Sequence, residues 1–110
     1  MGESDLRGVV PVLRIADARV AAAWYERLGF EVEWEHRFEP GLPLFVSIRR
    51  GDARIFLSEH TGDAPQNGLV YLYVDDLSSI GIEGEATEYG MVEAELVDPD
   101  GNRIRDGARA

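Results

Sequence analysis

The segment Asp98-Pro99-Asp100-Gly101-Asn102-Arg103-Ile104-Arg105 decides the fold that we predict for this chain. Its first five residues are typical of a tight turn. The Asp98 side chain can accept backbone hydrogen bonds, the proline fixes φ, and Gly101 permits a positive φ. The residue patterns of 91–97 before the turn and 103–107 after it predict two strands. The chain is therefore expected to close with a β-hairpin.

Length and composition indicate a single globular domain over residues 1–110. Hydrophobic residues make up 45% and charged residues 29% of the chain, as in ordinary soluble proteins. We find no apolar run long enough to cross a membrane, and the acidic first five residues do not resemble a signal peptide. The absence of cysteine excludes disulfides, zinc–thiolate sites and thiol catalysis. A cytoplasmic protein is the simplest interpretation.

The net charge of −10, from 11 basic and 21 acidic residues, narrows the range of partners. Nucleic acid is not expected, because its phosphates would be repelled. Cationic partners are favoured, since a negative potential raises their local concentration. Charge that serves solubility alone is the more common explanation, so this observation does not assign a function by itself.

The first half of the sequence predicts one helix and four strands. Residues 18–28 carry apolar side chains at helical spacing, with Asp17 placed to cap the start and Gly29 to follow the end. Pro11 restricts the first strand to an edge or a special pairing. The strands are predicted over residues 9–15, 30–38, 44–50 and 54–58, the last two joined by a tight turn.

The second half repeats this order incompletely. Asp75-Asp76-Leu77 resembles a second helix start, but the residues after it include two glycines and show little helical periodicity. Residues 76–90 are too few for a full helix, a strand and a turn, so the helix is expected to be reduced to about one turn or lost. A polar linker over residues 61–68 precedes strands predicted over residues 69–75, 91–97 and 103–107.

Together these elements predict an α+β protein of two βαβββ modules that form a cupped mixed sheet. Module one spans about residues 8–60, and module two spans about residues 68–107. The second helix would have covered one face of its sheet. Because exposed apolar sheet surface is a liability, either a loop or a second subunit is expected to cover that face.

Several segments of the chain occur in a characteristic order and spacing. They are Leu28-Gly29-Phe30-Glu31-Val32 after the helix with Trp24-Tyr25, the run from Gly68 to Leu77, Tyr89-Gly90, and the turn over residues 98–102. This order resembles the vicinal oxygen chelate superfamily, which includes glyoxalase I, extradiol dioxygenases and bleomycin resistance proteins. The bleomycin resistance group, which binds the drug without metal or turnover, is the most similar in character. The resemblance implies a homodimer, because this superfamily builds cups between paired modules and the strand carrying Pro11 often exchanges between subunits.

The resemblance also implies where a metal would be bound, and the residues there do not suit one. The implied positions fall near residues 10–11, at Leu69 and at Arg105, and none of these side chains binds a divalent metal. His60 lies among the acidic side chains of residues 59–63, a spacing that usually reflects solvated side chains rather than a metal site. We therefore expect no metal and no other cofactor.

Strand parity places several aromatic and charged side chains on the face of the cup. The resemblance puts Leu69 toward the cup, so that Tyr71 and Tyr73 share its side. The arginines of the last strand are expected either to pair with glutamates of strand 91–97 or to receive an acidic group of a ligand. The candidate ligand-binding residues are Trp34, Phe38, Phe45, Tyr71, Tyr73, Tyr89, Glu93, Arg103 and Arg105.

The sequence favours a non-catalytic protein that binds a small cationic or aromatic ligand. Aromatic faces stack on flat ligands and attract cations, although strand aromatics also serve packing and strand formation alone. By resemblance, the expected function is antibiotic sequestration and resistance of the bleomycin type. We recognise no nucleophile–base pair and no phosphate loop, so no catalytic residue is assigned. Two alternatives stay open: an enzyme of the same superfamily with an atypical site, and a ligand-free structural or interaction module.

Overall fold

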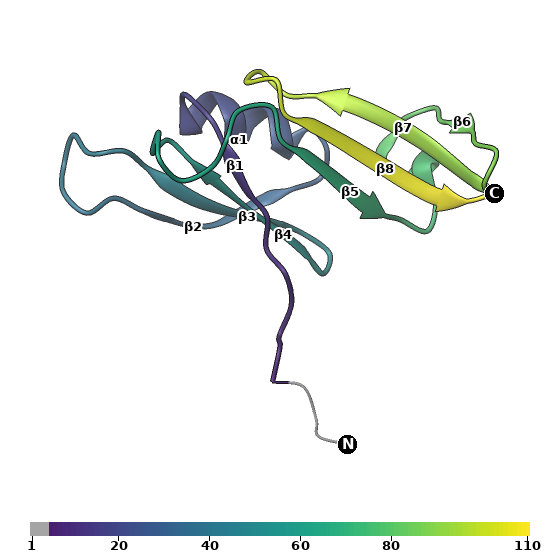
Figure 1. Ribbon diagram of the computed structural model, residues 1–110, viewed down its shortest axis with the longest axis horizontal. Helices are drawn as coiled ribbons and strands as arrows, with labels where there is room; N and C mark the ends of the chain where they lie inside the picture. Colours follow the sequence, from purple (N-terminus) through teal and green to yellow (C-terminus); the bar gives the residue numbers. More distant parts are fainter. Residues whose placement is uncertain (1–4) are drawn as a thin grey trace.

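The computed structural model describes residues 5–110, except for the side chains of residues 79 and 80. Within this part of the chain it contains two four-stranded sheets and a single α-helix. Figure 1 shows the two sheets side by side, with residues 5–11 extending away from them. The predicted α+β fold of two modules, the second without its helix, is confirmed. No helix in the described residues is long and apolar enough to span a membrane.

Module one forms sheet A, in which the strand order is β1-β4-β3-β2. β1 and β4 are parallel, and the other neighbours are antiparallel. A bulge between Val32 and Trp34 interrupts the pairing of β2, and such a bulge protects an exposed edge strand from pairing with another chain. The elements are β1 (Val12–Arg14), α1 (Ala18–Glu26), β2 (Glu31–His36), β3 (Phe45–Arg50) and β4 (Ala53–Ser58).

Module two forms sheet B, in which the order β5-β8-β7-β6 repeats that of sheet A. β5 and β8 are parallel, and the remaining pairs are antiparallel. A single turn of 3₁₀ helix, η1, stands where module one has α1. The elements are β5 (Leu69–Tyr73), η1 (Leu77–Ile80), β6 (Glu85–Ala86), β7 (Met91–Val97) and β8 (Arg103–Arg109).

Three details of the sequence prediction are wrong. α1 ends at Glu26 instead of residue 28, because Gly29, with φ 91°, already turns the chain toward β2. The first strand is shorter than predicted, over Val12–Arg14, and beyond its start Pro11 has no N–H to donate, although its carbonyl still accepts from the Phe56 N–H at 2.9 Å. The 2-residue strand β6 was not predicted, whereas η1, with 4 residues, confirms the expected reduction of the second helix to about one turn.

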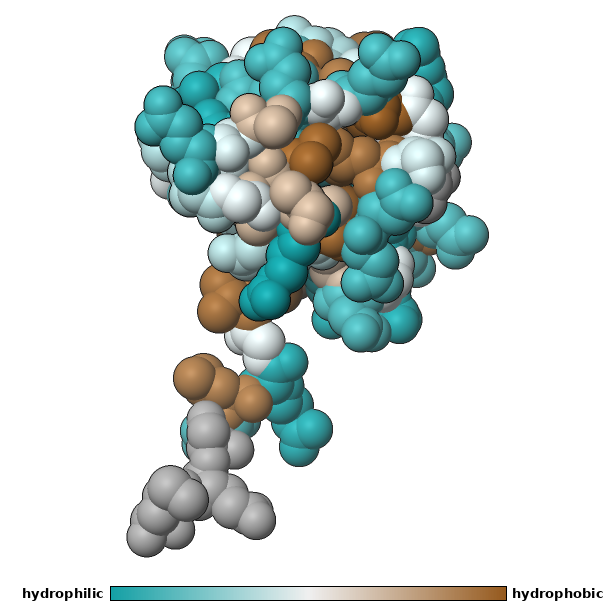
Figure 2. Space-filling view, turned by 90° about the vertical axis from the view of Figure 1, so that its right-hand side faces the viewer, coloured by the Kyte–Doolittle hydropathy of each residue, from teal (hydrophilic) through white to brown (hydrophobic). Residues whose placement is uncertain are grey.

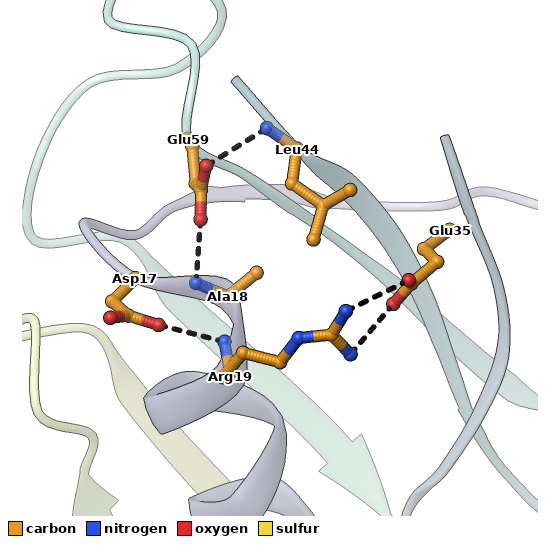
Figure 3. Close-up of polar contacts among 6 residues, drawn as sticks. All are labelled: Asp17, Ala18, Arg19, Glu35, Leu44 and Glu59. Carbon is orange, nitrogen blue, oxygen red and sulfur yellow. Dashed lines mark hydrogen bonds and ion pairs between the residues drawn. The ribbon is translucent and has the colours of Figure 1, made fainter. Parts of the chain in front are cut away.

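The start of α1 is fixed by two carboxylates (Figure 3). Asp17 accepts hydrogen bonds from two N–H groups of the first turn, at 2.9 and 3.2 Å, as its predicted capping role requires. Glu59 accepts one from the Ala18 N–H at 2.8 Å and another from the Leu44 N–H at 2.9 Å. Glu59 therefore ties the helix to the start of β3.

A shared apolar core joins the two sheets. Its largest buried cluster combines residues of α1 and sheet A with Val70 of β5 and Ile104 of β8. Tyr25 and Phe30 are its bulkiest fully buried members, and their rings meet edge to face at 5.7 Å. Burial of this cluster stabilises both sheets at once, because neither module has another cluster of comparable size among the described residues.

The turn over residues 98–102 does more than reverse the chain. Asp98 accepts backbone hydrogen bonds from within the turn, and Gly101 has a φ of 86°, as predicted. In addition, the Tyr25 hydroxyl of α1 donates to Asp98 at 2.7 Å. The Asn102 amide donates to the Arg14 carbonyl of β1 at 2.9 Å and to Asp98 at 3.0 Å. These contacts hold the last hairpin of module two against α1 and β1 of module one.

An ion pair forms a second link between the modules. Arg50, at the end of β3, contacts the fully buried carboxylate of Asp106 on β8 at 3.0 Å. The guanidinium lies 5.5 Å from the centre of the Phe30 ring, which adds a cation–π contact. A carboxylate buried to this degree requires a charged partner, so Arg50 and Asp106 form one structural unit.

A loop covers the sheet B face that lacks a helix. Leu77 of η1 packs on Ala94 and Ala108, with Ile82 against the same cluster. Gly84 fits tightly here, since a Cβ at that position would meet Leu77 and the neighbouring strand β7. Figure 2 faces this end of the molecule and shows apolar residues gathered at its centre with hydrophilic residues around them. The sequence predicted that either a loop or a second subunit covers this face, and the loop is present.

Candidate functional site

Each sheet turns one face to the core and the opposite face outward. The burial of Val70 and Ile104 agrees with the parity predicted for β5 and β8. The outward side of sheet A, called face A, carries Trp34, Phe45, Ser47, Arg54 and Phe56, and that of sheet B, called face B, carries Leu69, Tyr71, Tyr73, Glu93, Glu95, Arg103, Arg105 and Gly107.

Glu93 lies at the centre of a group of tyrosines on face B. The Tyr71 hydroxyl of β5 donates to its Oε2 atom at 2.7 Å, and the Tyr89 hydroxyl donates to the same oxygen at 2.6 Å. Tyr73 lies beside Tyr71, with the ring centres 5.1 Å apart. Four of the predicted site residues are therefore brought together, and a carboxylate is held among aromatic rings.

These hydrogen bonds fix the charges on this part of face B. The bonds from Tyr89 and Tyr71 lower the pKa of the Glu93 carboxyl, because they favour its ionised form. The reciprocal effect of Glu93 raises the pKa of Tyr71 to about 12 and also raises the pKa of Tyr89. Near neutral pH, Glu93 is therefore negative and both tyrosines are neutral donors.

The two arginines of face B are engaged by another glutamate. Arg105 contacts Glu95 Oε1 at 2.7 Å, and Arg103 lies 3.7 Å from the same oxygen. The hydrogen bond to Glu95 raises the pKa of Arg105, so this arginine keeps its charge. Of the two roles predicted for these arginines, pairing across the hairpin is the one that the structure contains.

Face A holds a separate aromatic group. Trp34 stacks on Phe45 at 6.1 Å with an angle of 16° between the rings, and both contact Phe56. Phe38 lies near the end of β2, edge-on to His36 at 4.5 Å. Phe56 was not among the predicted site residues. The apolar residues Ile55 and Leu57 on either side of it face the core, so the alternation along the strand indicates that Phe56 lies on the opposite face.

A charged group borders the aromatic rings of face A. Hydrogen bonds from Arg54 and Ser47 lower the pKa of the Glu33 carboxyl to about 2. Arg49 lies 3.9 Å from the same carboxylate. Face A therefore presents two guanidinium groups around one carboxylate, beside the aromatic rings of Trp34, Phe45 and Phe56.

The nine predicted site residues fall into two groups on different sheets. Trp34, Phe38 and Phe45 belong to sheet A or the loop after β2, and the remaining six belong to sheet B or the loop before β7. No ring contact between described residues joins the two groups. A groove of about 700 Å³ lies between the β3–β4 turn and the end of β5, and its lining includes Tyr71, Tyr73, Arg50 and Asp52.

The family of the chain follows from a comparison with protein-family models. A model described as "Glyoxalase superfamily protein" matches residues 1–110. The chain belongs to the glyoxalase superfamily. A comparison with curated protein sequences returns no match.

Solved structures of this glyoxalase superfamily fold include antibiotic-binding proteins. A bleomycin-binding protein complexed with bleomycin is 29% identical, covers 96% of this chain and 100% of its own, and has a TM-score of 0.69. A bleomycin resistance determinant encoded on the transposon Tn5 is 28% identical, with coverage of 94% and 98% and a TM-score of 0.73. TnmS3, an antibiotic binding protein from Streptomyces sp. CB03234, is similar in fold at 21% identity, with coverage of 98% and 100% and a TM-score of 0.73.

The residues of this glyoxalase superfamily protein do not fit the metal bound by the superfamily's metalloenzymes. Among the described residues, no three His, Cys, Asp or Glu side chains gather in a way that could hold a metal ion. Leu69 offers no donor atom, and the guanidinium of Arg105 cannot ligate a cation. Near His60, Glu59 is occupied by two backbone N–H groups and Asp63 accepts from Ser58 at 2.6 Å. No step of chemistry is therefore assigned to a metal.

Proposed function

We propose that this protein is a non-catalytic binding protein that sequesters a bleomycin-type antibiotic and so confers resistance. The observation that carries the proposal is its similarity, over nearly the whole length of both chains, to a bleomycin-binding protein complexed with bleomycin. Protection would come from lowering the concentration of free drug. The protein must then be as abundant as the drug and bind it tightly enough to compete with the drug's target.

The outward faces of the two sheets supply suitable chemistry. The rings of Trp34 and Phe45, which are nearly parallel, can stack on a planar aromatic group, with the tilted ring of Phe56 beside them. The negative carboxylate of Glu93, among the tyrosines of face B, suits a cationic group. A ligand with both kinds of group would use both faces.

A homodimer is part of the same proposal. The N-terminal segment over residues 5–11 extends away from the two sheets (Figure 1). Its apolar side chains Leu6 and Val9 are 79% and 89% exposed, and burial of such side chains would be favourable. A second copy would bury this segment and set face A of one subunit opposite face B of the other. The two aromatic groups, which are separate within one chain, would then line one cup.

Calorimetric titration with metal-free bleomycin tests the proposed function. Saturable binding near one drug per chain, weaker at higher salt, is expected because the net charge of −10 contributes to the attraction. The variant Trp34→Ala should reduce the affinity, whereas Val20→Ala, at an exposed position on α1, should not. No heat and no rise in melting temperature with excess drug would refute the antibiotic assignment and favour a ligand-free module.

Sedimentation equilibrium tests the homodimer. A mass near twice that of the chain is expected, and removal of residues 1–9 should shift the equilibrium toward the monomer. A monomeric protein at concentrations where bleomycin still binds would refute the shared cup.

A further inference from the structure

Tyr71 reaches Glu93 by lying across a glycine. β8 runs between β5, which carries Tyr71, and β7, which carries Glu93. At the crossing point β8 has Gly107, the cross-strand partner of both Tyr73 and Glu93. A Cβ added to Gly107 would lie 1.8 Å from the Tyr71 hydroxyl oxygen and 2.5 Å from Cζ. No other residue type at 107 is therefore compatible with this position of the tyrosine ring.

The missing side chain gives face B a flat aromatic floor. Because Gly107 has no side chain, the Tyr71 ring lies over β8 and its hydroxyl donates a hydrogen bond to Glu93. Tyr73 rises beside it at an angle of 61° between the rings and is 84% exposed. Tyr89, on the other side of Glu93, is 67% exposed. These large rings are open to solvent, so their faces can receive a ligand.

Glu93 forms no ion pair among the described residues, because the nearby Arg105 is bonded to Glu95. The charge of Arg105 still favours the ionised form of Glu93, and Arg109 lies beside Tyr73 and Gly107 in a second groove. The pairing of β6 with β7 places Glu85 directly opposite Glu93. Like charges in opposite positions of a sheet destabilise it, and a bound cation would offset that repulsion. Tyrosine faces attract cations for the same electrostatic reason.

We propose that Tyr71, Tyr73, Tyr89, Glu93 and Gly107 form a site for a flat organic cation, with Glu93 as the counter-charge and Gly107 as a positioning residue. The inference rests on the proposed ligand-binding function and specifies which part of a ligand face B takes. The cation stacks on the Tyr71 ring, and Tyr73 and Tyr89 flank it. Glu85 adds negative charge from the edge strand.

Titration with a matched pair of small probes tests this site. The probes are N-methylquinolinium, a flat cation, and quinoline, which has the same shape and is neutral at pH 7.5. Two-dimensional NMR follows the Gly107 signals, which report the position of the Tyr71 ring because that ring occupies the space of an added Cβ at 107. We expect N-methylquinolinium to shift these signals saturably and to bind roughly tenfold more tightly than quinoline. Equal affinities, no saturable shift, or shifts centred on Trp34 and Phe45 would each overturn the proposal.

Two charge variants separate the local site from the overall charge of the protein. Glu93→Gln keeps an acceptor for the tyrosine hydroxyls but removes the charge, and it should weaken N-methylquinolinium binding roughly tenfold. Glu83→Gln, at an exposed position outside the site, changes the net charge equally and should weaken binding less than about twofold at moderate salt. Similar effects of both variants would attribute binding to the general negative field and overturn the site.

The role of Gly107 has its own matched control. Gly107→Ala should displace the Tyr71 ring and abolish its ring-current shift on residue 107. It should also weaken N-methylquinolinium binding roughly tenfold, as Glu93→Gln does. Gly62→Ala, where no atom lies within 4 Å of an added Cβ, should change neither. If Gly107→Ala does not fold, Tyr71→Phe replaces it, since it keeps the ring and loses only the bond to Glu93. Unchanged cation affinity in the folded variant would overturn the positioning role.

The antibiotic titration distinguishes failure of this inference from failure of the proposed function. Bleomycin binding that survives Glu93→Gln, with no binding of N-methylquinolinium, would leave the proposed function standing and overturn the cation site. Cation binding that depends on Glu93, without binding of bleomycin, would support the site and overturn the antibiotic assignment.

Discussion

Replacing Asn102 with alanine should remove much of the stability of this protein. The side chain is fully buried, and it makes three hydrogen bonds between the modules and within the turn. Its amide donates to the Arg14 carbonyl at 2.9 Å and to Asp98 at 3.0 Å, and its oxygen accepts from the Gly68 N–H at 2.9 Å. Alanine removes all three bonds and leaves the Arg14 carbonyl and the Gly68 N–H, which are partly buried, without them.

The magnitude follows from the cost of such unpaired groups. A buried polar group that loses its partner costs about 1 to 3 kcal/mol, and Asp98 keeps other donors, so two groups are left without a side-chain partner. We expect the free energy of unfolding to fall by about 3 to 5 kcal/mol, a large part of the roughly 5 to 15 kcal/mol typical of a domain.

Urea unfolding followed by circular dichroism measures this change. Gln66→Ala removes a side-chain amide from an exposed position and serves as the matched control, with an expected change below about 0.5 kcal/mol. Tyr25→Phe removes a single bond to Asp98 and should cost about 1.5 to 3 kcal/mol, because its acceptor is charged. Measured in a double-mutant cycle, Tyr25→Phe and Asn102→Ala should be coupled through Asp98. A loss below about 1 kcal/mol for Asn102→Ala would refute the idea that this turn fastens the modules together.

Three further predictions concern charge and protonation. The folded pKa of Glu33 lies at about 2, below its usual value of 4.5. The bond of Glu33 with Arg54 therefore stabilises the fold fully at a pH above 4.5, and this stabilisation is lost as the pH falls toward 2. Thermal melting between pH 5 and pH 2 should therefore decline less steeply in Glu33→Gln, and parallel profiles would contradict the assignment. Asp106→Ala leaves the guanidinium of Arg50, whose side chain is 16% exposed, without its partner and should cost about 3 kcal/mol in urea unfolding, whereas less than 1 kcal/mol would show that water replaces the carboxylate. The pKa of Tyr71 is raised to about 12, so its stabilising bond is lost as the pH rises from 10 to 12, and Tyr71→Phe should remove a late phenolate step from the ultraviolet titration.

Much of the fold could be predicted because its signals are local. The helical spacing after Asp17, the alternation along residues 44–50 and 54–58, and the turn over residues 98–102 each appear within a few residues of sequence. The helix end and the strand at Val12–Arg14 were less accurate, since element ends depend on capping and pairing partners. β6 was missed because two residues are too few to carry a periodic pattern.

In the candidate site, too, local patterns could be predicted from the sequence and contacts between distant segments could not. Parity within β5 and β8 placed Tyr71, Tyr73 and Arg105 on one face, because side chains alternate along any strand. The sequence does not decide the parity of β7, since either of its faces could match the last strand. The bond from Tyr71 to Glu93 settles it and spans 22 positions of sequence, with β8 between the two strands. Only the strand order identifies Gly107 as the residue over which that bond passes.

The sequence by itself determined the elements, their order in two modules, and the loss of the second helix, because short-range sterics and periodic burial act within each segment. The tertiary structure decided which charged groups are paired. Arg105 forms an ion pair with Glu95, whereas Glu93 accepts hydrogen bonds from two tyrosines. Asp98 accepts a hydrogen bond from Tyr25 and so joins α1 to the last hairpin. The physical reason is distance, because hydrogen bonds and ion pairs form only within a few ångströms. Which side chains come that close depends on how the two sheets are ordered and packed, and no single segment of the chain contains that information.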